Sequence, residues 1–242
     1  MSNLLESPYI SSNGSGDNLY RARGDEVYLG RPILTGDIFT WKHKVGQDET
    51  NCKTRTVIIL QHPCSMRTDG VNLSSHLLVA EVRKRKPLSE DDWNKGYFNL
   101  MPLPALKPAI ETGQRDQAAD FNNLHIVDPE EFDTRLAALS QFGVNLLLQR
   151  WIHYTSRLIV PTYQIQEVTE AFYEEADLFE DWCFDTTDTC DQESIQQASK
   201  QCLEWLRADR GGRTYQECLK DPQSRSTVRA EMRKELKSRQ TS

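Results

Sequence analysis

The pattern of apolar residues in the first half of the chain is typical of β-strands. Residues 37–41 alternate polar side chains with large β-forming ones, as a half-buried strand does. Residues 55–61 contain four consecutive aliphatic side chains, which predicts a strand buried on both faces. Together these patterns predict a β-rich domain over residues 26–127. Further strands are predicted at residues 77–82, 97–101 and 121–127.

In the second half the apolar residues recur three and four positions apart, as in amphipathic helices. Asp128 followed by Pro129 is typical of a helix start, because aspartate caps free backbone N–H groups and proline loses nothing at the first helical position. We therefore expect a short helix with Phe132, Leu136 and Leu139 on one face. Longer helices are predicted at about residues 141–158, 164–184, 192–208 and 214–239.

The order of strands followed by helices predicts an α+β fold with a small antiparallel, barrel-like (SH3-like or PemK-like) core. Residues 1–25 are rich in Ser, Asn and Gly, and we expect them to form a disordered arm. The predicted organisation is this arm, the β-rich domain at 26–127 and a helical region at 128–242.

Composition limits the classes of protein to consider. The 242 residues carry a formal net charge of −7, which argues against a protein that coats nucleic acid with its whole surface. No window has the roughly 18 consecutive apolar residues of a membrane span, and the first residues lack the features of a secretory signal. We therefore expect a cytoplasmic protein without membrane contact. The six cysteines form no C-x-x-C pair and are expected to be reduced thiols.

The charge is distributed unevenly along the chain. No Lys or Arg occurs from Leu158 to Ser199, a stretch that contains a run of acidic residues. Residues 220–242 are basic and include Arg229 and Arg233. This basic segment has two interpretations: it docks on nucleic acid, or it folds back against the acidic helix of the same chain.

Two short segments carry candidate chemistry. His62 and Cys64 follow the strongest predicted strand, where reactive groups are often held rigidly, and a nearby imidazole lowers the pKa of a thiol. The same pair supplies two potential metal ligands, or else forms only a turn and a buried small residue. Arg55 precedes that strand, where it either presents its guanidinium group to a phosphate or is simply solvated.

The block Arg83, Lys84, Arg85 and Lys86 is a candidate contact for a nucleic-acid backbone or an acidic partner. We expect this block on a turn between two strands. The alternative to binding is that its four side chains are simply solvated. The common phosphate-loop, dinucleotide, zincin and esterase motifs do not occur in the sequence, and no cofactor is predicted.

The order of three segments resembles the PemK/MazF family of small β-barrel proteins. These segments are Gly36 to Phe39, Arg55 to Leu60 and Leu77 to Val82. The best-known members of that family are toxins that cleave single-stranded RNA without a metal, and the resemblance implies that Arg55 occupies the position of the catalytic arginine. The toxins usually carry a hydroxyl residue after the third strand, whereas Arg83 follows it here.

A second resemblance, to uncharacterised bacterial and phage proteins, extends to about residue 161. Those proteins also place a Ser/His-x-Cys loop after a strand, here His62 to Cys64, and continue through a segment like Tyr97 to Pro104. This resemblance implies no activity.

The main hypothesis from the sequence is a bacterial or phage accessory protein, a non-enzymatic interaction module that contacts nucleic acid or a protein partner through basic segments. The first alternative is a metal-independent endoribonuclease with Arg55 stabilising phosphate charge and His62 as acid or base. The second is an enzyme that depends on Cys64 or on a metal.

Overall fold

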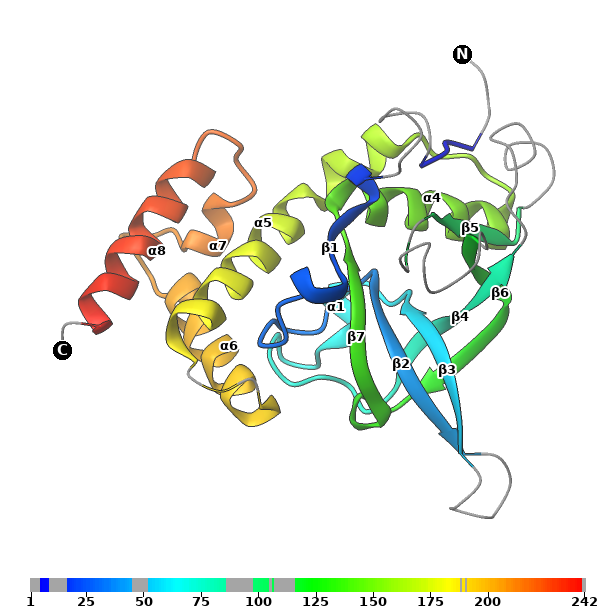
Figure 1. Cartoon of the computed structure of the whole chain (residues 1–242). Coiled ribbons are helices and arrows are strands. Elements are labelled where there is room, and N and C mark those ends of the chain that lie inside the picture. Colours follow the sequence, from blue (N-terminus) through cyan, green and yellow to red (C-terminus); the bar gives the residue numbers. More distant parts are fainter. Residues whose placement is uncertain are drawn as a thin grey trace. The chain divides into compact units, whose positions relative to one another are not determined.

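The computed structural model describes residues 5–8, 17–44, 52–85, 98–104, 106, 116–187, 189 and 191–240. Seven strands form one antiparallel sheet in the order β1-β7-β2-β3-β4-β6-β5 (Figure 1). The predicted α+β class is confirmed. The strands are β1 (Tyr20–Arg23), β2 (Asp37–Lys44), β3 (Cys52–Ile59), β4 (Leu77–Arg85), β5 (Leu100–Leu103), β6 (Asp116–Val127) and β7 (Phe132–Leu139).

Most of the helical structure follows the sheet in sequence. Three of the predicted long helices are present at nearly their expected positions, as α4, α5 and α6. The α-helices are α1 (Pro63–Met66), α4 (Gln141–Ser156), α5 (Thr162–Thr186), α6 (Gln192–Arg207), α7 (Tyr215–Cys218) and α8 (Arg225–Gln240). Short 3-10 helices are η1 (Asp17–Leu19), η2 (Gly24–Glu26) and η3 (Pro129–Glu131).

β3 lies in the middle of the sheet, as its aliphatic sequence predicts. Val57, Ile58 and Ile59 are all fully buried, so both faces of this strand are covered. β4 pairs with β3 through Val57 and Glu81, and β2 pairs with β3 through Trp41 and Arg55. This register brings Arg55 of β3 close to Glu81 of β4.

The prediction of a short helix after Asp128 is wrong, because residues 132–139 form the strand β7. Asp128 does accept a hydrogen bond from the backbone N–H of Glu130 at 3.0 Å, but the helix it caps is the single 3-10 turn η3. β7 then lies between β1 and β2, which supply its backbone hydrogen bonds. Phe132 stacks on Phe39 with ring centroids 4.7 Å apart, so tertiary pairing overrides the local helical pattern.

The prediction of a disordered arm over residues 1–25 is wrong for the parts that the structure describes, residues 5–8 and 17–25. Tyr20–Arg23 form β1, and the Tyr20 hydroxyl donates to the backbone carbonyl of Pro104 at 2.9 Å. Leu5 is buried, and the backbone N–H of Glu6 donates to the side-chain carbonyl of Gln149 at 2.8 Å. These residues pack against the sheet and α4 despite the polar composition around them.

Three further boundaries differ from the predictions. Residue 97 lies outside the described residues, and β5 begins only at Leu100. β6 begins at Asp116, earlier than the predicted residue 121. The single helix expected over residues 214–239 is divided into α7 and α8 by a turn that contains Pro222, which lacks the N–H that a continuous helix requires.

The chain divides into two compact units. The first contains residues 1–27, 35–66 and 74–167, and with them the whole sheet and α4. The second contains Tyr28–Leu34, Arg67–Leu73 and Val168–Ser242. The boundary between the two units on the C-terminal side of the sheet therefore falls inside α5. The boundary predicted between the β-rich domain and the helical region was at residue 127.

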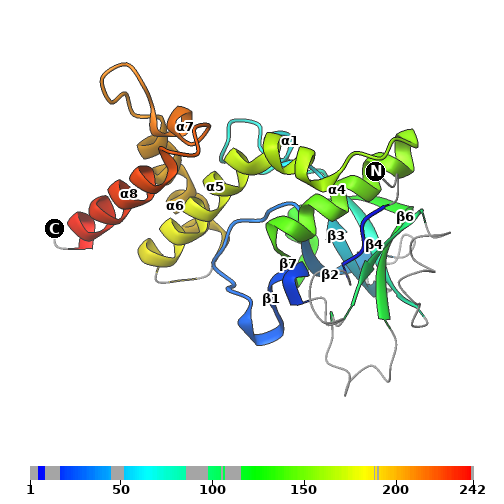
Figure 2. The same ribbon diagram turned by 90° about the horizontal axis from the view of Figure 1, so that it is seen from above.

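The second unit has its own apolar core, in which Trp182 of α5 packs against Trp205 of α6 with ring centroids 5.7 Å apart. Figure 2 shows α6 and α8 beside the later part of α5. Across the described ranges, none of the helices combines the length and the apolar character that a bilayer crossing requires.

Candidate functional site

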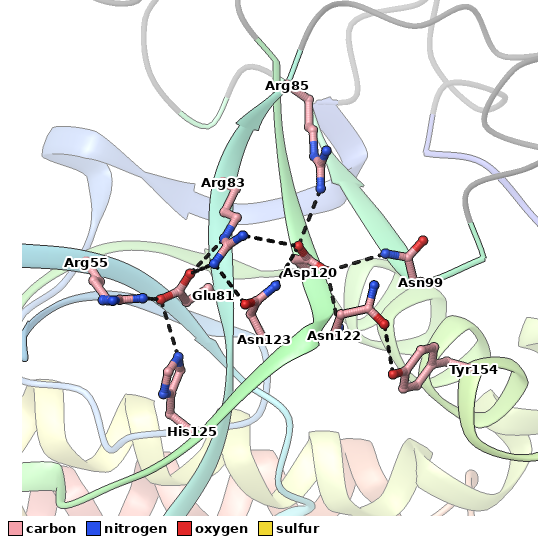
Figure 3. A network of polar contacts seen from close by, with 10 residues as sticks. All are labelled: Arg55, Glu81, Arg83, Arg85, Asn99, Asp120, Asn122, Asn123, His125 and Tyr154. Atoms are coloured by element: carbon pink, nitrogen blue, oxygen red, sulfur yellow. Dashed lines mark hydrogen bonds and ion pairs between the residues drawn. The ribbon is translucent and has the colours of Figure 1, made fainter.

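Polar residues of β3, β4 and β6 gather on one face of the sheet (Figure 3). Arg55 lies within β3 and not before it, because the strand begins at Cys52. Residues two positions apart on a strand share a face, so Glu81, Arg83 and Arg85 of β4 project to the same side. The register places Glu81 beside Asp120 of β6, and Arg55 of β3 reaches Glu81 from the other side. All of these residues belong to the first unit.

Glu81 is the first of two buried carboxylates in this group, with a side chain only 6% exposed. One of its oxygens pairs with Nη1 of Arg55. The other accepts from Nε of Arg83 at 2.7 Å and lies 2.6 Å from Nη2 of the same residue. A buried carboxylate is costly unless it is paired, and here two guanidinium groups compensate it.

Asp120 is the second buried carboxylate, and its side chain is 4% exposed. It accepts from the side-chain amides of Asn123 at 2.9 Å and Asn99 at 3.4 Å, and from the backbone N–H of Asn122 at 3.1 Å. Nη2 of Arg85 lies 3.4 Å from its Oδ2. Its position is thus fixed by neutral donors as well as by charge.

Arg83 connects the two carboxylates. Besides Glu81, it approaches Asp120, with Nη1 at 3.8 Å from Oδ2, and it donates from Nη2 to the side-chain carbonyl of Asn123 at 2.8 Å. One guanidinium group therefore holds β4 and β6 together through side-chain contacts.

A bulge in β6 makes these contacts possible. Ala80 pairs with Leu124, but the next residue, Glu81, pairs with Asp120, so residues 121–123 have no counterpart on β4. A bulge bends its strand and redirects side chains. The extra residues bring Asn122 and Asn123 around the Asp120 carboxylate.

The cations lie nearer to solvent than the carboxylates that hold them. The side chains of Arg55, Arg83 and Arg85 are 33%, 43% and 37% exposed. Lys53, two residues before Arg55 on β3, is exposed as well. We call Arg55, Arg83 and Arg85, with Glu81 and Asp120 beneath them, the guanidinium platform. Its exposed layer is cationic even though the buried layer is acidic.

His125 of β6 lies at one side of the platform, with Nε2 3.3 Å from Oε1 of Glu81. Burial, followed by the positive charge of Arg55, holds the pKa of His125 below its ordinary value of 6.5. Its imidazole is therefore neutral at neutral pH. The ring also lies 5.0 Å from the Trp41 ring and 6.0 Å from the His43 ring, measured between centroids.

Of the residues predicted at the strand end, the structure brings only Arg55 into this group. His62 lies three residues beyond Ile59, the last residue of β3, and its backbone carbonyl accepts from the N–H groups of Ser65 and Met66 in α1. Burial lowers the pKa of His62. Cys64 belongs to α1, and its side chain lies outside the described part of the structure.

The basic block is not on a turn, which corrects the prediction. Arg83, Lys84 and Arg85 are the last residues of β4, and Lys86 lies outside the described residues. Strand alternation separates the exposed Lys84 from the two arginines and places it on the opposite face.

Sequence reasoning missed Glu81, Asp120 and His125 as members of the site. A signal for Glu81 was present in the Glu-x-Arg-x-Arg spacing at residues 81–85, because a strand places those three side chains on one face. Asp120 and His125 depend on the β6 bulge, which no local pattern predicts.

The C-terminal arginines have a different environment in the second unit. Nη2 of Arg229 lies 2.6 Å from Oε2 of Glu174 and 3.2 Å from Oδ2 of Asp177, both on α5. Arg225 pairs with Glu170 at 2.7 Å. These ion pairs agree with the second interpretation of the basic segment, in which it folds back against the acidic helix of the same chain. Arg233 is exposed.

Neither the models of known protein families nor the curated proteins contain a match to this chain. Within the described residues, no three His, Cys, Asp or Glu side chains gather as a set of metal ligands. The site consists of partly exposed arginines in fixed positions, beside a neutral imidazole.

Proposed function

We propose that the guanidinium platform binds the phosphate groups of a nucleic-acid strand, as part of a non-enzymatic interaction module. The observation that supports this most directly is the layering of the site. Buried Glu81 and Asp120 fix three arginines whose side chains are 33%, 43% and 37% exposed. Arginine groups held in this way lose little side-chain entropy when they bind phosphate oxygens.

The spatial repetition of the cations favours a polyanion over a single small anion. Arg55 lies on β3, while Arg83 and Arg85 follow each other on the neighbouring β4, so the charges extend along and across the strands. Phosphate binding depends on the local field, which makes it compatible with the net charge of −7. We propose that Lys53 extends the same surface.

The proposal is tested by fluorescence anisotropy with a labelled 20-nucleotide single strand in EDTA at low salt. Arg85→Gln should weaken binding about three- to tenfold, because it removes one cation from the platform. Arg233→Gln is the matched control, an exposed arginine on α8 outside the platform, and should leave the affinity unchanged. Equal affinities for wild type and Arg85→Gln would contradict the proposal.

A second candidate function, metal-independent cleavage of RNA, is favoured by the position of His125. The resemblance to the PemK/MazF toxins assigns the phosphate-stabilising role to Arg55, and we propose His125 in place of His62 as the acid–base group. A neutral imidazole accepts the proton of the 2′-hydroxyl as that oxygen bonds to phosphorus. The bond from phosphorus to the 5′-oxygen breaks, and the imidazolium returns the proton to that oxygen.

The two candidates are distinguished by gel electrophoresis of labelled RNA incubated with the protein in EDTA. Shortened RNA that disappears with His125→Gln, but persists with His62→Gln, would support cleavage by this site. Intact, retarded RNA would support the binding module alone. Cleavage that survives His125→Gln would exclude His125 as the acid–base group.

A further inference from the structure

The polar network does not end at the platform but continues from Asp120 to α4 (Figure 3). Asn122, in the β6 bulge, donates its backbone N–H to Asp120, and its side-chain carbonyl accepts from the hydroxyl of Tyr154 at 3.0 Å. Asn122 is exposed, and Tyr154 is half-buried. We infer that Asn122 and Tyr154 form a subsite for an unpaired nucleic-acid base next to the guanidinium platform.

The hydrogen bond from Tyr154 determines which end of the Asn122 amide is available. Because the carbonyl oxygen faces the tyrosine, the NH₂ group is directed away from it, toward an incoming acceptor. The backbone of Asn122 is held by Asp120 and has no strand partner on β4. The amide is therefore an exposed donor in a fixed place, as recognition of a base edge requires.

Tyr154, which bonds to Asn122, belongs to a cluster of three aromatic rings. Tyr154 stacks on Trp151 with ring centroids 5.8 Å apart and an interplanar angle of 19°, and both rings are half-buried. The buried Phe121 contacts both, with centroids 5.4 Å from Trp151 and 5.7 Å from Tyr154. Rings supported from beneath are suited to stack on a base, which adds to affinity without strict sequence preference.

The ligand class follows from this combination of groups. A duplex keeps its base faces stacked and its pairing edges occupied, so only an unpaired base offers both a face and a free edge. The inference rests on the proposed function, because the platform must hold the adjacent phosphates. A single strand that lies across β3 and β4 then places one base at Asn122 and Tyr154.

The experiment compares two labelled 12-nucleotide strands of equal charge, one with thymine bases and one with abasic sites throughout, by fluorescence anisotropy in EDTA. Wild type should bind the thymine strand about tenfold tighter than the abasic strand, as expected for stacking of one base. Tyr154→Leu and Asn122→Ala should reduce this preference at least threefold and leave the affinity for the abasic strand unchanged. Tyr163→Leu removes an exposed tyrosine of α5 and should retain the preference.

The outcomes separate the subsite from the platform. If wild type binds both strands equally, or if Tyr154→Leu keeps the full preference, the base subsite is wrong while phosphate binding stands. If wild type binds neither strand, the proposed function itself fails. A thermal melt of each variant verifies that a reduced preference does not reflect unfolding.

Discussion

At the residue scale, the defining feature of the guanidinium platform is that its two buried carboxylates, Glu81 and Asp120, serve as anchors for cations. Glu81 is compensated by Arg55 and Arg83, and it gives each of these guanidinium groups a buried carboxylate partner. Both oxygens of this carboxylate are occupied by guanidinium groups. We therefore assign Glu81 a positioning role and leave proton transfer, in the second candidate function, to His125.

Replacing this anchor should cost stability. Glu81→Gln removes the charge that two arginines share, and we expect the free energy of unfolding to fall by about 2 kcal/mol, less than for a fully buried pair because the arginines are partly solvated. Urea denaturation measures the change. Glu130→Gln, at an exposed glutamate of η3, should stay within about 0.5 kcal/mol of wild type. Equal loss in the two variants would contradict the anchoring role.

The histidine at the platform predicts a pH dependence of stability. The pKa of His125 is lowered in the folded state, so the unfolded chain takes up the proton first as the pH falls below about 6.5. The free energy of unfolding should therefore decrease as the pH is lowered. His125→Gln should reduce the slope of unfolding free energy against pH between 7.5 and 5, without abolishing it, because the pKa of His62 is lowered too. A slope that is the same for His125→Gln and wild type would contradict a lowered pKa of His125 in the folded state.

At the residue scale, the sequence predicted Arg55 and the basic residues of β4 as candidates but not their partners. Once β4 is recognised as a strand, the spacing Glu81-x-Arg83-x-Arg85 predicts that these three side chains lie on one face, because side chains alternate between the two faces of a strand. Asp120 is different: its approach to Glu81 requires three extra residues in β6. Pairing across strands distant in sequence cannot be inferred from either strand alone.

At the scale of secondary-structure elements, a turn at Gly36 fixes how β2, β3 and β7 meet. The N–H of Gly36 donates to the carbonyl of Ile59 at 2.9 Å, and its own carbonyl accepts from Leu139 at 3.2 Å. Its φ is +83°, a conformation that side chains disfavour. A Cβ at this position would also lie 2.8 Å from Cγ2 of Val144 on α4.

Gly36→Ala should therefore destabilise the protein through two effects. The left-handed backbone costs roughly 1–2 kcal/mol for a residue with a Cβ, and the close contact with Val144 adds to it. Gly211→Ala is a matched control with φ of +86° and open space around its Cβ, so it carries only the backbone cost. We expect Gly36→Ala to lose at least about 1 kcal/mol more than Gly211→Ala in urea denaturation. Equal losses would indicate that the turn tolerates a side chain.

The pairing of α8 with α5 gives a second prediction at this scale. Arg229→Ala removes the ion pairs with Glu174 and Asp177 and should lower the free energy of unfolding by about 1 kcal/mol at low salt, with a smaller loss in 0.5 M salt. Arg233→Ala, one helical turn later and exposed, should change it little. Thermal melts at the two salt concentrations test this. A loss from Arg229→Ala that is the same at both would argue against ion pairing.

Periodic elements were the easiest to predict at this scale. α4, α5 and α6 follow from apolar spacing, and β3 from its aliphatic run. Residues 132–139 were predicted as helix because of Asp128, Pro129 and leucines at helical spacing. Their strand form depends on β1 and β2, which flank β7 and use its backbone groups. Backbone pairing with these two strands outweighs the local helical pattern, which produces only the 3-10 turn η3.

At the scale of the whole molecule, charge is partitioned between the two units. The second unit uses part of its basic segment internally, in ion pairs between α8 and the acidic side of α5. The first unit presents Arg55, Arg83 and Arg85 on one face of the sheet, above buried acids. The net charge of −7 thus conceals a local cationic surface, and we expect nucleic acid to bind the first unit and not the C-terminal helix.

The most direct test of this claim is the salt dependence of binding to a labelled single strand, measured from 50 to 300 mM salt for wild type and for Arg83→Gln. The slope of log K against log salt concentration changes by about 0.7 for each phosphate of a single strand that the protein neutralises. We predict a linear decrease for wild type and a slope shallower by roughly that amount for Arg83→Gln. Binding that is independent of salt, or identical slopes for the two proteins, would contradict the guanidinium platform as the phosphate-binding surface.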